Sequence, residues 1–320
     1  MVILQLEENN KMIRKELFLL FIFLVLFNPH LYAEQTSIIQ GDHIVVVFEE
    51  PLRFVANEAV KIFPTIKNDL ERGMNWTLDF RPTLVLTNNR QRFEEMTGSR
   101  SVVACAVPQR NLMVIDYTKV NIAPFSLGTI IRHELSHLLL HSQVKNGRLP
   151  RWLDEGISQL ASDGIAEIMM SRKASTLDKA VLSKKLMPLE SLNQSFPKDE
   201  DSLLLAYEES KSFVEFINHV FGREGIQDLL GNLQAGNEIE VAVLQSFSVP
   251  FDELERRWHN HLRRQITWFT YLANNLYALL FFVAALITIA GFVRMVIKKR
   301  RYGEDEPGRP CVPPCGLLPS

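Results

Sequence analysis

An H-E-x-x-H motif at residues 133–137 constrains the fold of this chain more than any other feature. Residues four apart lie on the same face of an α-helix, so His133 and His137 can present their imidazoles to one metal ion. Glu134 is rotated by about 100° from His133, where its carboxylate reaches the open side of such an ion without being a ligand. The motif therefore predicts a helix that carries two metal ligands and a general base.

A third ligand is expected from Glu155, in the string W-L-D-E-G at residues 152–156. Residues 129–142 are strongly apolar and lack Pro and Gly, which predicts a helix, and the following N-G-R-L-P turn lets the chain double back into a second helix. Two imidazoles and one carboxylate leave a position for water, which is the pattern of a catalytic zinc site with one Zn²⁺ per chain. Manganese or cobalt would fit the same ligands less typically.

The stretch from His133 to Glu155 resembles the gluzincin metallopeptidases of the peptidase MA-like family. In these proteins the glutamate of the W-L-x-E-G string is the third zinc ligand, which implies that role for Glu155. The likeness extends over roughly residues 80–262 and includes residues 205–214, which are similar to the family's Y-x-x-S-x-x-F-V helix. A metzincin is a poor alternative, because its motif needs Gly and His where this chain has Leu140 and Gln143.

The resemblance and the residue chemistry together predict a reaction. Zinc lowers the pKa of its bound water, and Glu134 takes the proton from that water and hands it to the leaving amine. Tyr207 is the expected donor to the oxyanion by resemblance, and a tyrosine packed in a helix with its hydroxyl at the surface is the alternative. Asp154 either orients a histidine or only stabilises the N-terminus of its helix through the helix dipole, and we favour the second interpretation. Some gluzincins orient a zinc histidine with an aspartate at the position of Gln159.

The two ends of the chain predict export and anchoring. Basic residues precede a short apolar run at 17–27, which is typical of a signal peptide over residues 1–33. Residues 266–297 contain an apolar run long enough to cross a membrane, and basic residues 298–301 follow it. The positive-inside rule then places residues 298–320 in the cytoplasm and residues 34–265 outside it, on the plasma (inner) membrane. Whether the signal segment is cleaved stays open.

Composition adds limits on partners. With 320 residues, 22% charged residues and a net charge of −2, the chain suits one globular domain plus membrane segments and shows no bias toward nucleic acid. The expected partners are a peptide or protein substrate and the membrane, through a single C-terminal span. Cys105 is expected to be a small buried apolar residue. Cys311 and Cys315 lie in a Pro-rich tail that is unstructured by default, with a metal pair, a redox pair or lipidation as alternatives.

The pattern of elements predicts an α+β, zincin-like fold. A mixed α/β N-terminal half carries the H-E-x-x-H helix, a helical C-terminal half supplies the third ligand, and one transmembrane helix follows. Residues 186–198 are expected to line or cover the cleft between the halves. The edge strand of a hairpin is expected, by resemblance, to pair with an extended peptide. Strands are predicted at 43–48, 82–87, 101–107 and 111–116, and helices at 52–72, 91–96, 151–170, 177–186, 201–221, 223–234 and 251–265.

The sequence therefore predicts a membrane-anchored, zinc-dependent metallopeptidase. One alternative is a non-catalytic, zinc-stabilised, membrane-anchored binding or scaffold protein. Another is a metal-free assembly protein with a decayed version of the same fold. Decay is disfavoured because both histidines and both glutamates of the site are intact, and neither alternative explains why Glu134 accompanies the ligands.

Overall fold

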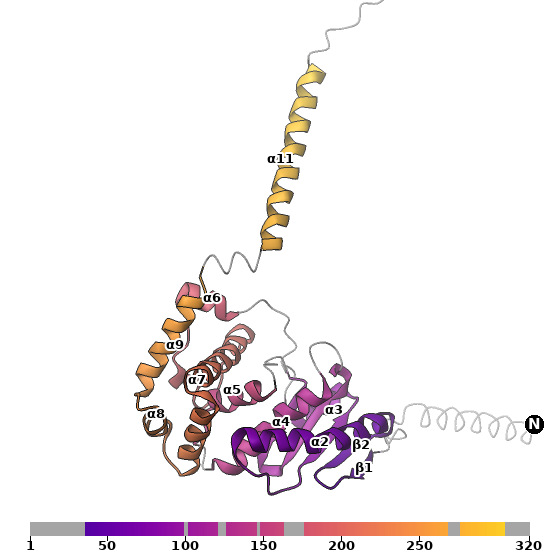
Figure 1. Ribbon diagram of the computed structural model, residues 1–320. Coiled ribbons are helices and arrows are strands. Elements are labelled where there is room, and N and C mark those ends of the chain that lie inside the picture. The colour runs from indigo at the N-terminus through magenta and orange to yellow at the C-terminus, as the bar shows by residue number, and fades with distance from the viewer. Residues whose placement is uncertain are drawn as a thin grey trace, which may run out of the picture. The chain divides into compact units, whose positions relative to one another are not determined.

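The computed structural model describes residues 36–98, 102–120, 126–145, 148–162, 176–267 and 276–304 (Figure 1). The expected signal segment, residues 1–33, and the tail with Cys311 and Cys315 lie outside these residues. The chain divides into two compact units. The first comprises Met1–Leu177 and Leu186–Trp258, and the second comprises Asp178–Lys185 and His259–Ser320.

A mixed five-stranded sheet forms one part of the first unit. Its strands are β1 (Thr36–Gln40), β2 (Val45–Glu49), β3 (Thr83–Thr87), β4 (Ala104–Val107) and β5 (Leu112–Asp116). Their order is β1-β2-β3-β5-β4, with β2, β3 and β5 parallel and the two edge strands antiparallel to their neighbours. The expected hairpin of β4 and β5 is thus present, and β4 is a sheet edge.

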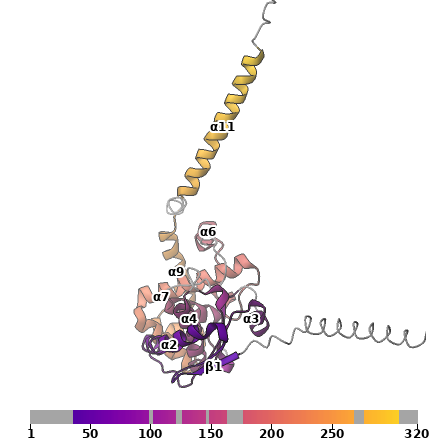
Figure 2. The same ribbon diagram turned by 90° about the vertical axis from the view of Figure 1, so that its right-hand side faces the viewer.

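Three helices flank this sheet: α2 (Arg53–Met74), α3 (Arg90–Thr97) and α4 (Leu127–Gln143). α2 and α4 contact each other and lie side by side in two views, with α2 against β2 and α4 against β4 and β5 (Figures 1 and 2). Ser126 caps α4, because its side chain accepts a hydrogen bond from the backbone N–H of Thr129 at 3.2 Å. The H-E-x-x-H helix is therefore fixed between a long helix and the sheet edge.

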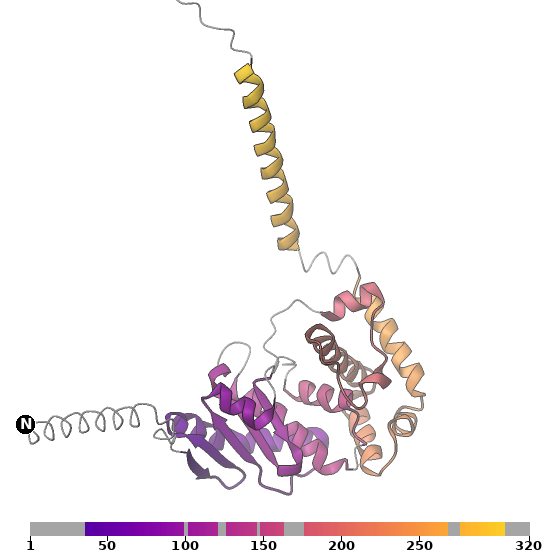
Figure 3. The same cartoon turned by 180° about the vertical axis from the view of Figure 1, so that it is seen from behind.

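The other part of the first unit is helical. It contains α5 (Arg151–Ala161), α7 (Glu200–Gln234), α8 (Ile239–Phe247) and most of α9 (Phe251–Gln265). Figure 3 shows the strands gathered on one side of this unit and these helices on the other. Gly222 interrupts α7 with a φ of 72°, which agrees with the two helices predicted at 201–221 and 223–234. On α9, Arg256 and Arg257 form ion pairs with acidic residues of the same helix.

α5 and α7 approach each other closely at Gly156. A Cβ atom at this position would lie 2.5 Å from the carbonyl oxygen of Ser210, so any larger residue would force the helices apart. Trp152, one turn earlier, is fully buried, stacks edge-on against Phe213 and donates from its indole to Asn193 at 2.9 Å. The W-L-D-E-G string therefore combines a buried anchor with the small residue that this packing requires.

The predicted fold class is confirmed, with corrections to single elements. β1 and α8 were not predicted from the sequence. The helix predicted at 151–170 ends at Ala161, because Ser162 has non-helical backbone angles. Short 3₁₀ turns were also not expected, at η1 (Glu50–Leu52), η2 (Pro108–Arg110), η3 (Tyr117–Lys119) and η4 (Leu189–Leu192).

The second unit contains most of α6 (Thr176–Ser183) and all of α11 (Leu276–Glu304). Within the described residues, one segment, Leu279–Lys299 of α11, is long and apolar enough to cross a membrane. This segment overlaps the span predicted at 266–297, and its length and composition are those of a membrane helix.

Candidate metal centre and active site

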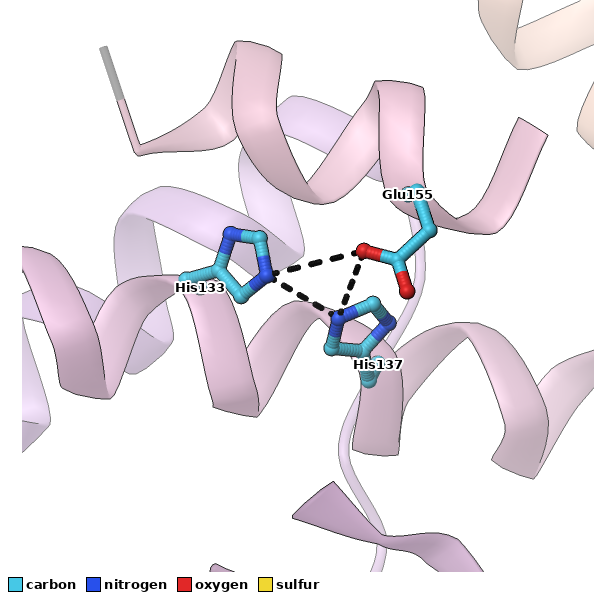
Figure 4. Close-up of side chains that lie close together, drawn as sticks. All are labelled: His133, His137 and Glu155. Atoms are coloured by element: carbon cyan, nitrogen blue, oxygen red, sulfur yellow. Dashed lines mark hydrogen bonds and ion pairs between the residues drawn. The ribbon is translucent and has the colours of Figure 1, made fainter. Parts of the chain in front are cut away.

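Side chains from α4 and α5 converge on one point. His133 and His137 project from the same face of α4, and Glu155 reaches toward them from the first turns of α5 (Figure 4). The two histidine Nε2 atoms lie 3.1 Å apart, and the Glu155 Oε2 atom lies 3.7 Å from Nε2 of His137 and 3.9 Å from Nε2 of His133. All three residues are buried.

This donor set fits a zinc ion. Two nitrogen ligands of a tetrahedral zinc lie roughly 3.3 Å apart when each is about 2.0–2.1 Å from the ion. The separation of the two Nε2 atoms, 3.1 Å, is close to that value. The Nδ1 atoms of His137 and His133 have hydrogen-bond partners in Asp154 and Ser162, which leaves their Nε2 atoms for a metal.

Asp154 fixes the orientation of His137. Its Oδ1 atom lies 2.7 Å from Nδ1 of His137, and its Oδ2 atom lies 2.9 Å from Nε2 of His141. From the sequence we expected Asp154 only to stabilise the N-terminus of its helix, and that interpretation is therefore wrong. The cause is geometric: the side chain of Asp154 points back toward α4 across the contact between the two helices. His141 hydrogen-bonds Asp154 and is not one of the three residues whose ligand atoms converge.

His133 is held by the later part of α5. Its ring hydrogen-bonds the backbone carbonyl of Ser158, and its Nδ1 atom lies 3.4 Å from Oγ of Ser162. Gln159 does not replace the aspartate found there in some gluzincins. It is fully buried, and its amide donates to the backbone carbonyl of Tyr207 at 3.2 Å.

The electrostatics of the site favour a positive charge between the ligands. Burial lowers the pKa of His137, but Asp154, Glu155 and Glu134 together outweigh burial and raise this pKa to about 10. Burial, followed by His137, lowers the pKa of His133 well below its usual range. Burial also disfavours the charged form of Asp154, but His137 and His141 prevail and hold its pKa far below the ordinary value. A divalent cation would meet the same attraction.

Glu134 is buried next to the ligands, on the side of strand β4. Burial raises its pKa to about 8, and the opposing influences are the charge of His137 and a hydrogen bond from the backbone N–H of Ala106. Without a bound metal ion Glu134 therefore holds a proton more strongly than an ordinary carboxyl. The positive charge of an ion held by the three neighbouring side chains would favour its ionised form, which a general base needs. Ala106 was not recognised from the sequence, and nothing in the sequence pattern distinguishes its amide.

Tyr207 and Arg151 surround the other oxygen of Glu155. The hydroxyl of Tyr207 lies 3.5 Å from Oε1 of Glu155, and the Nη2 atom of Arg151 lies 3.4 Å from the same oxygen. Burial, and then the charge of Glu155, raises the pKa of Tyr207, so its phenol stays protonated. The hydroxyl thus points into the site and not to the surface. Arg151 was missed, although it precedes Glu155 by one helical turn and so shares its face.

A cavity of about 440 Å³ opens onto these residues. Its lining includes the site residues and residues of the β4 hairpin, among them Cys105. Cys105 is therefore partly exposed to this cavity and is not the buried core residue that we expected. Burial raises the pKa of its thiol to about 11, so it is protonated at neutral pH. Residues 186–198 contribute nothing to the described lining, but Phe196 packs against Tyr207.

The chain is similar to one protein family and to one solved structure. A solved structure of native yeast LTA4 hydrolase is similar, with 15% identity and a TM-score of 0.44; the match covers 77% of this chain and 42% of that one, so the chain spans less than half of that protein's length. No curated protein sequence matches the chain. The family model of the peptidase MA superfamily matches residues 94–264, more than half of the chain and all of the converging residues. The expected resemblance is confirmed: the chain belongs to the peptidase MA superfamily.

Proposed function

We propose that this protein is a membrane-anchored, zinc-dependent peptidase of the gluzincin type. His133, His137 and Glu155 would hold the ion, and Glu134 would be the general base. The observation that carries the proposal is the convergence of the three ligand side chains within 4.8 Å beside a buried glutamate that lines the same cavity. A binding module stabilised by zinc would need the three ligands but not Glu134.

The roles of the residues follow from their positions. When bound, zinc would supply Lewis acidity, which lowers the pKa of water and polarises the substrate carbonyl. Glu134 takes a proton from the attacking water and delivers it to the departing amine nitrogen, a role that its place beside the ligands in the lining of the cavity supports. Tyr207 lines the cavity as a protonated phenol and donates a hydrogen bond to the developing oxyanion.

The substrate is proposed to bind as an extended peptide along β4. Among the described residues this strand is an edge of the sheet, with a strand on one side only, and its residues Ala104 to Ala106 line the cavity. An added strand would hydrogen-bond the backbone groups that face the cavity, apart from the N–H of Ala106, which donates to Glu134, and would pass next to Glu134.

The proposed arrangement in the cell rests on both ends of the chain. Residues 1–33 would be a signal peptide, 34–265 an extracytoplasmic peptidase domain, 266–297 a membrane segment and 298–320 a cytoplasmic tail. Support comes from the apolar helix Leu279–Lys299 and from the basic residues at its end, which favour the cytoplasmic side.

The test compares the purified full-length chain with two variants. We expect about one zinc per wild-type chain and zinc-dependent cleavage of a peptide library. Glu134→Gln should keep the zinc and lose the cleavage, because it removes only the base. Glu155→Ala should lose zinc affinity and activity together. Full, chelator-sensitive cleavage by Glu134→Gln would rule out the proposed mechanism, and a folded wild-type chain that binds no zinc would rule out the metal site.

A further inference from the structure

Arg151 occupies a distinctive place in the cavity beside the proposed metal site. It is the first residue of α5, one helical turn before Glu155, and its side chain lines the cavity. Among the described residues that line this cavity, it is the only lysine or arginine. Its side chain is 44% exposed, so the guanidinium is accessible to a bound molecule.

The guanidinium is held in a defined orientation. Its central carbon lies 5.0 Å from the centroid of the Phe196 ring, and Phe196 in turn packs edge-on against Tyr207. One end of the group faces Oε1 of Glu155 at 3.4 Å, and Tyr207 is a further hydrogen-bond partner. A stacked arginine loses little additional freedom when it binds a planar anion, which is the usual reason for arginine at carboxylate sites.

The acidic groups of the cavity leave Arg151 with unused donors. Asp154 is engaged by His137 and His141, and Glu155 directs its other oxygen toward the histidines. Glu134 hydrogen-bonds the amide of Ala106. A guanidinium has five N–H donors, so contacts with Glu155 and Tyr207 do not exhaust them. Arg151 and the three ligand residues line the same cavity, so its remaining donors are accessible to a molecule bound there.

We infer that Arg151 binds a carboxylate of the substrate next to the scissile bond, which makes substrates with a negative charge at that point the preferred class. The inference rests on the proposed function, because it assigns the substrate of the same cavity. The carboxylate could come from the free C-terminus of a peptide or from an Asp or Glu side chain. Both present the same planar anion to the guanidinium. Arg151 is then a specificity-determining residue.

Binding of two small probes tests this inference without any peptide cleavage. Succinate carries two carboxylates, and succinamate replaces one of them with an amide of similar shape. We expect the zinc-loaded, full-length protein to bind succinate about tenfold more tightly than succinamate by calorimetry, since a charge-assisted pair with arginine replaces a neutral contact. Equal affinities for the two probes would overturn the inference.

Three variants connect that preference to Arg151. In Arg151→Met the ratio of the two affinities should fall to near one, and in Arg151→Lys it should be intermediate, because the charge remains without the planar fork. Arg110→Met is the matched control, since Arg110 is an exposed arginine at the end of η2 that does not line the cavity. If Arg151 had only a structural role, Arg151→Met would weaken the binding of both probes equally and leave the ratio of their affinities unchanged. Zinc content and circular dichroism report folding of each variant.

Peptides then identify the source of the carboxylate. Faster cleavage of peptides with free rather than amidated C-termini assigns the terminal carboxylate, and faster cleavage of Glu than Gln peptides with amidated ends assigns a side chain. Equal cleavage of all of them would refute the inference and leave the peptidase proposal standing. Selective binding of succinate without cleavage of any peptide would refute the peptidase proposal and leave the carboxylate site at Arg151 standing.

Discussion

Glu155 uses its two carboxylate oxygens for different neighbours. Oε2 faces the imidazoles of His133 and His137, while Oε1 faces Arg151 and the hydroxyl of Tyr207. These contacts on one oxygen fix the rotation of the carboxylate, so that the other oxygen is already directed toward the proposed ion. Orientation of a ligand by groups behind it raises metal affinity and sets geometry.

The same principle gives a prediction for Asp154. Asp154→Asn keeps the shape of the side chain but removes the charge that faces His137 and His141. Loss of such a partner typically costs about 10- to 100-fold in metal affinity, so we expect a decrease of this size in a competition titration with a chromophoric chelator. Asp252→Asn, an exposed position on α9, is the control. An unchanged zinc affinity in Asp154→Asn would show that this carboxylate does not support the ligand.

Glu209 on α7 predicts a pH dependence of stability away from the metal site. The residue is fully buried, and burial raises its pKa to about 8 despite a hydrogen bond from the N–H of Met187. The native state therefore keeps a proton that the unfolded chain releases above about pH 4.5. Stability should fall as the pH rises from about 4.5 to 8, by roughly a few kcal/mol at most.

Glu209→Gln removes this titration. Urea unfolding of the variant should match wild type near pH 4.5 and show higher stability than wild type near pH 8. The difference between the two proteins, measured across the pH range, isolates the contribution of Glu209 from that of other groups. A constant difference at all pH values would contradict the assignment.

At the scale of elements, the contact between α5 and α7 determines where the third ligand lies. Gly156→Ala should destabilise the protein by roughly 1–3 kcal/mol, because its Cβ would meet the carbonyl of Ser210. It should also weaken zinc binding, since Glu155 is the adjacent residue. Gly231→Ala is a matched control on α7, with no atom near the added Cβ, and should be neutral or slightly stabilising. Thermal unfolding and zinc titration of both variants provide the measurement.

Most elements were predictable from the sequence for identifiable reasons. Strong apolar periodicity indicated α2 and α4, and Gly222 correctly marked the break within α7. β1 was missed because it is a short edge strand, Thr36–Gln40, with polar residues at both ends and no continuous apolar run. Its pairing with β2 depends on contacts that a local pattern does not contain.

The site was predictable to the extent that spacing along a helix determines it. His133, His137 and Glu155 do converge, since the i, i+4 spacing puts both histidines on one face of α4 and α5 packs against that helix. The partners of these residues were not predictable. The contact from Asp154 to His137 and the stacking of Arg151 on Phe196 depend on how α5 lies against other segments. Such distances are set by tertiary packing.

At the scale of the whole molecule, α11 predicts that the protein is inserted in a membrane. Leu279–Lys299 has the length and hydropathy of a membrane helix. We expect the full-length protein to remain with membranes after washing with alkaline carbonate, and a chain truncated after Gln265 to be released with its zinc site intact. Extraction of the full-length protein by carbonate would contradict membrane insertion.

The close contact at Gly156 has a consequence for the order of events during synthesis. His133, Glu134 and His137 are together as soon as α4 forms, but Glu155 joins them only after α5 has docked on both α4 and α7. A nascent chain that ends before α7 has therefore only two of the three ligands in place. For the proposed peptidase, this dependence would delay the onset of hydrolysis until the helical part of its own domain has been made.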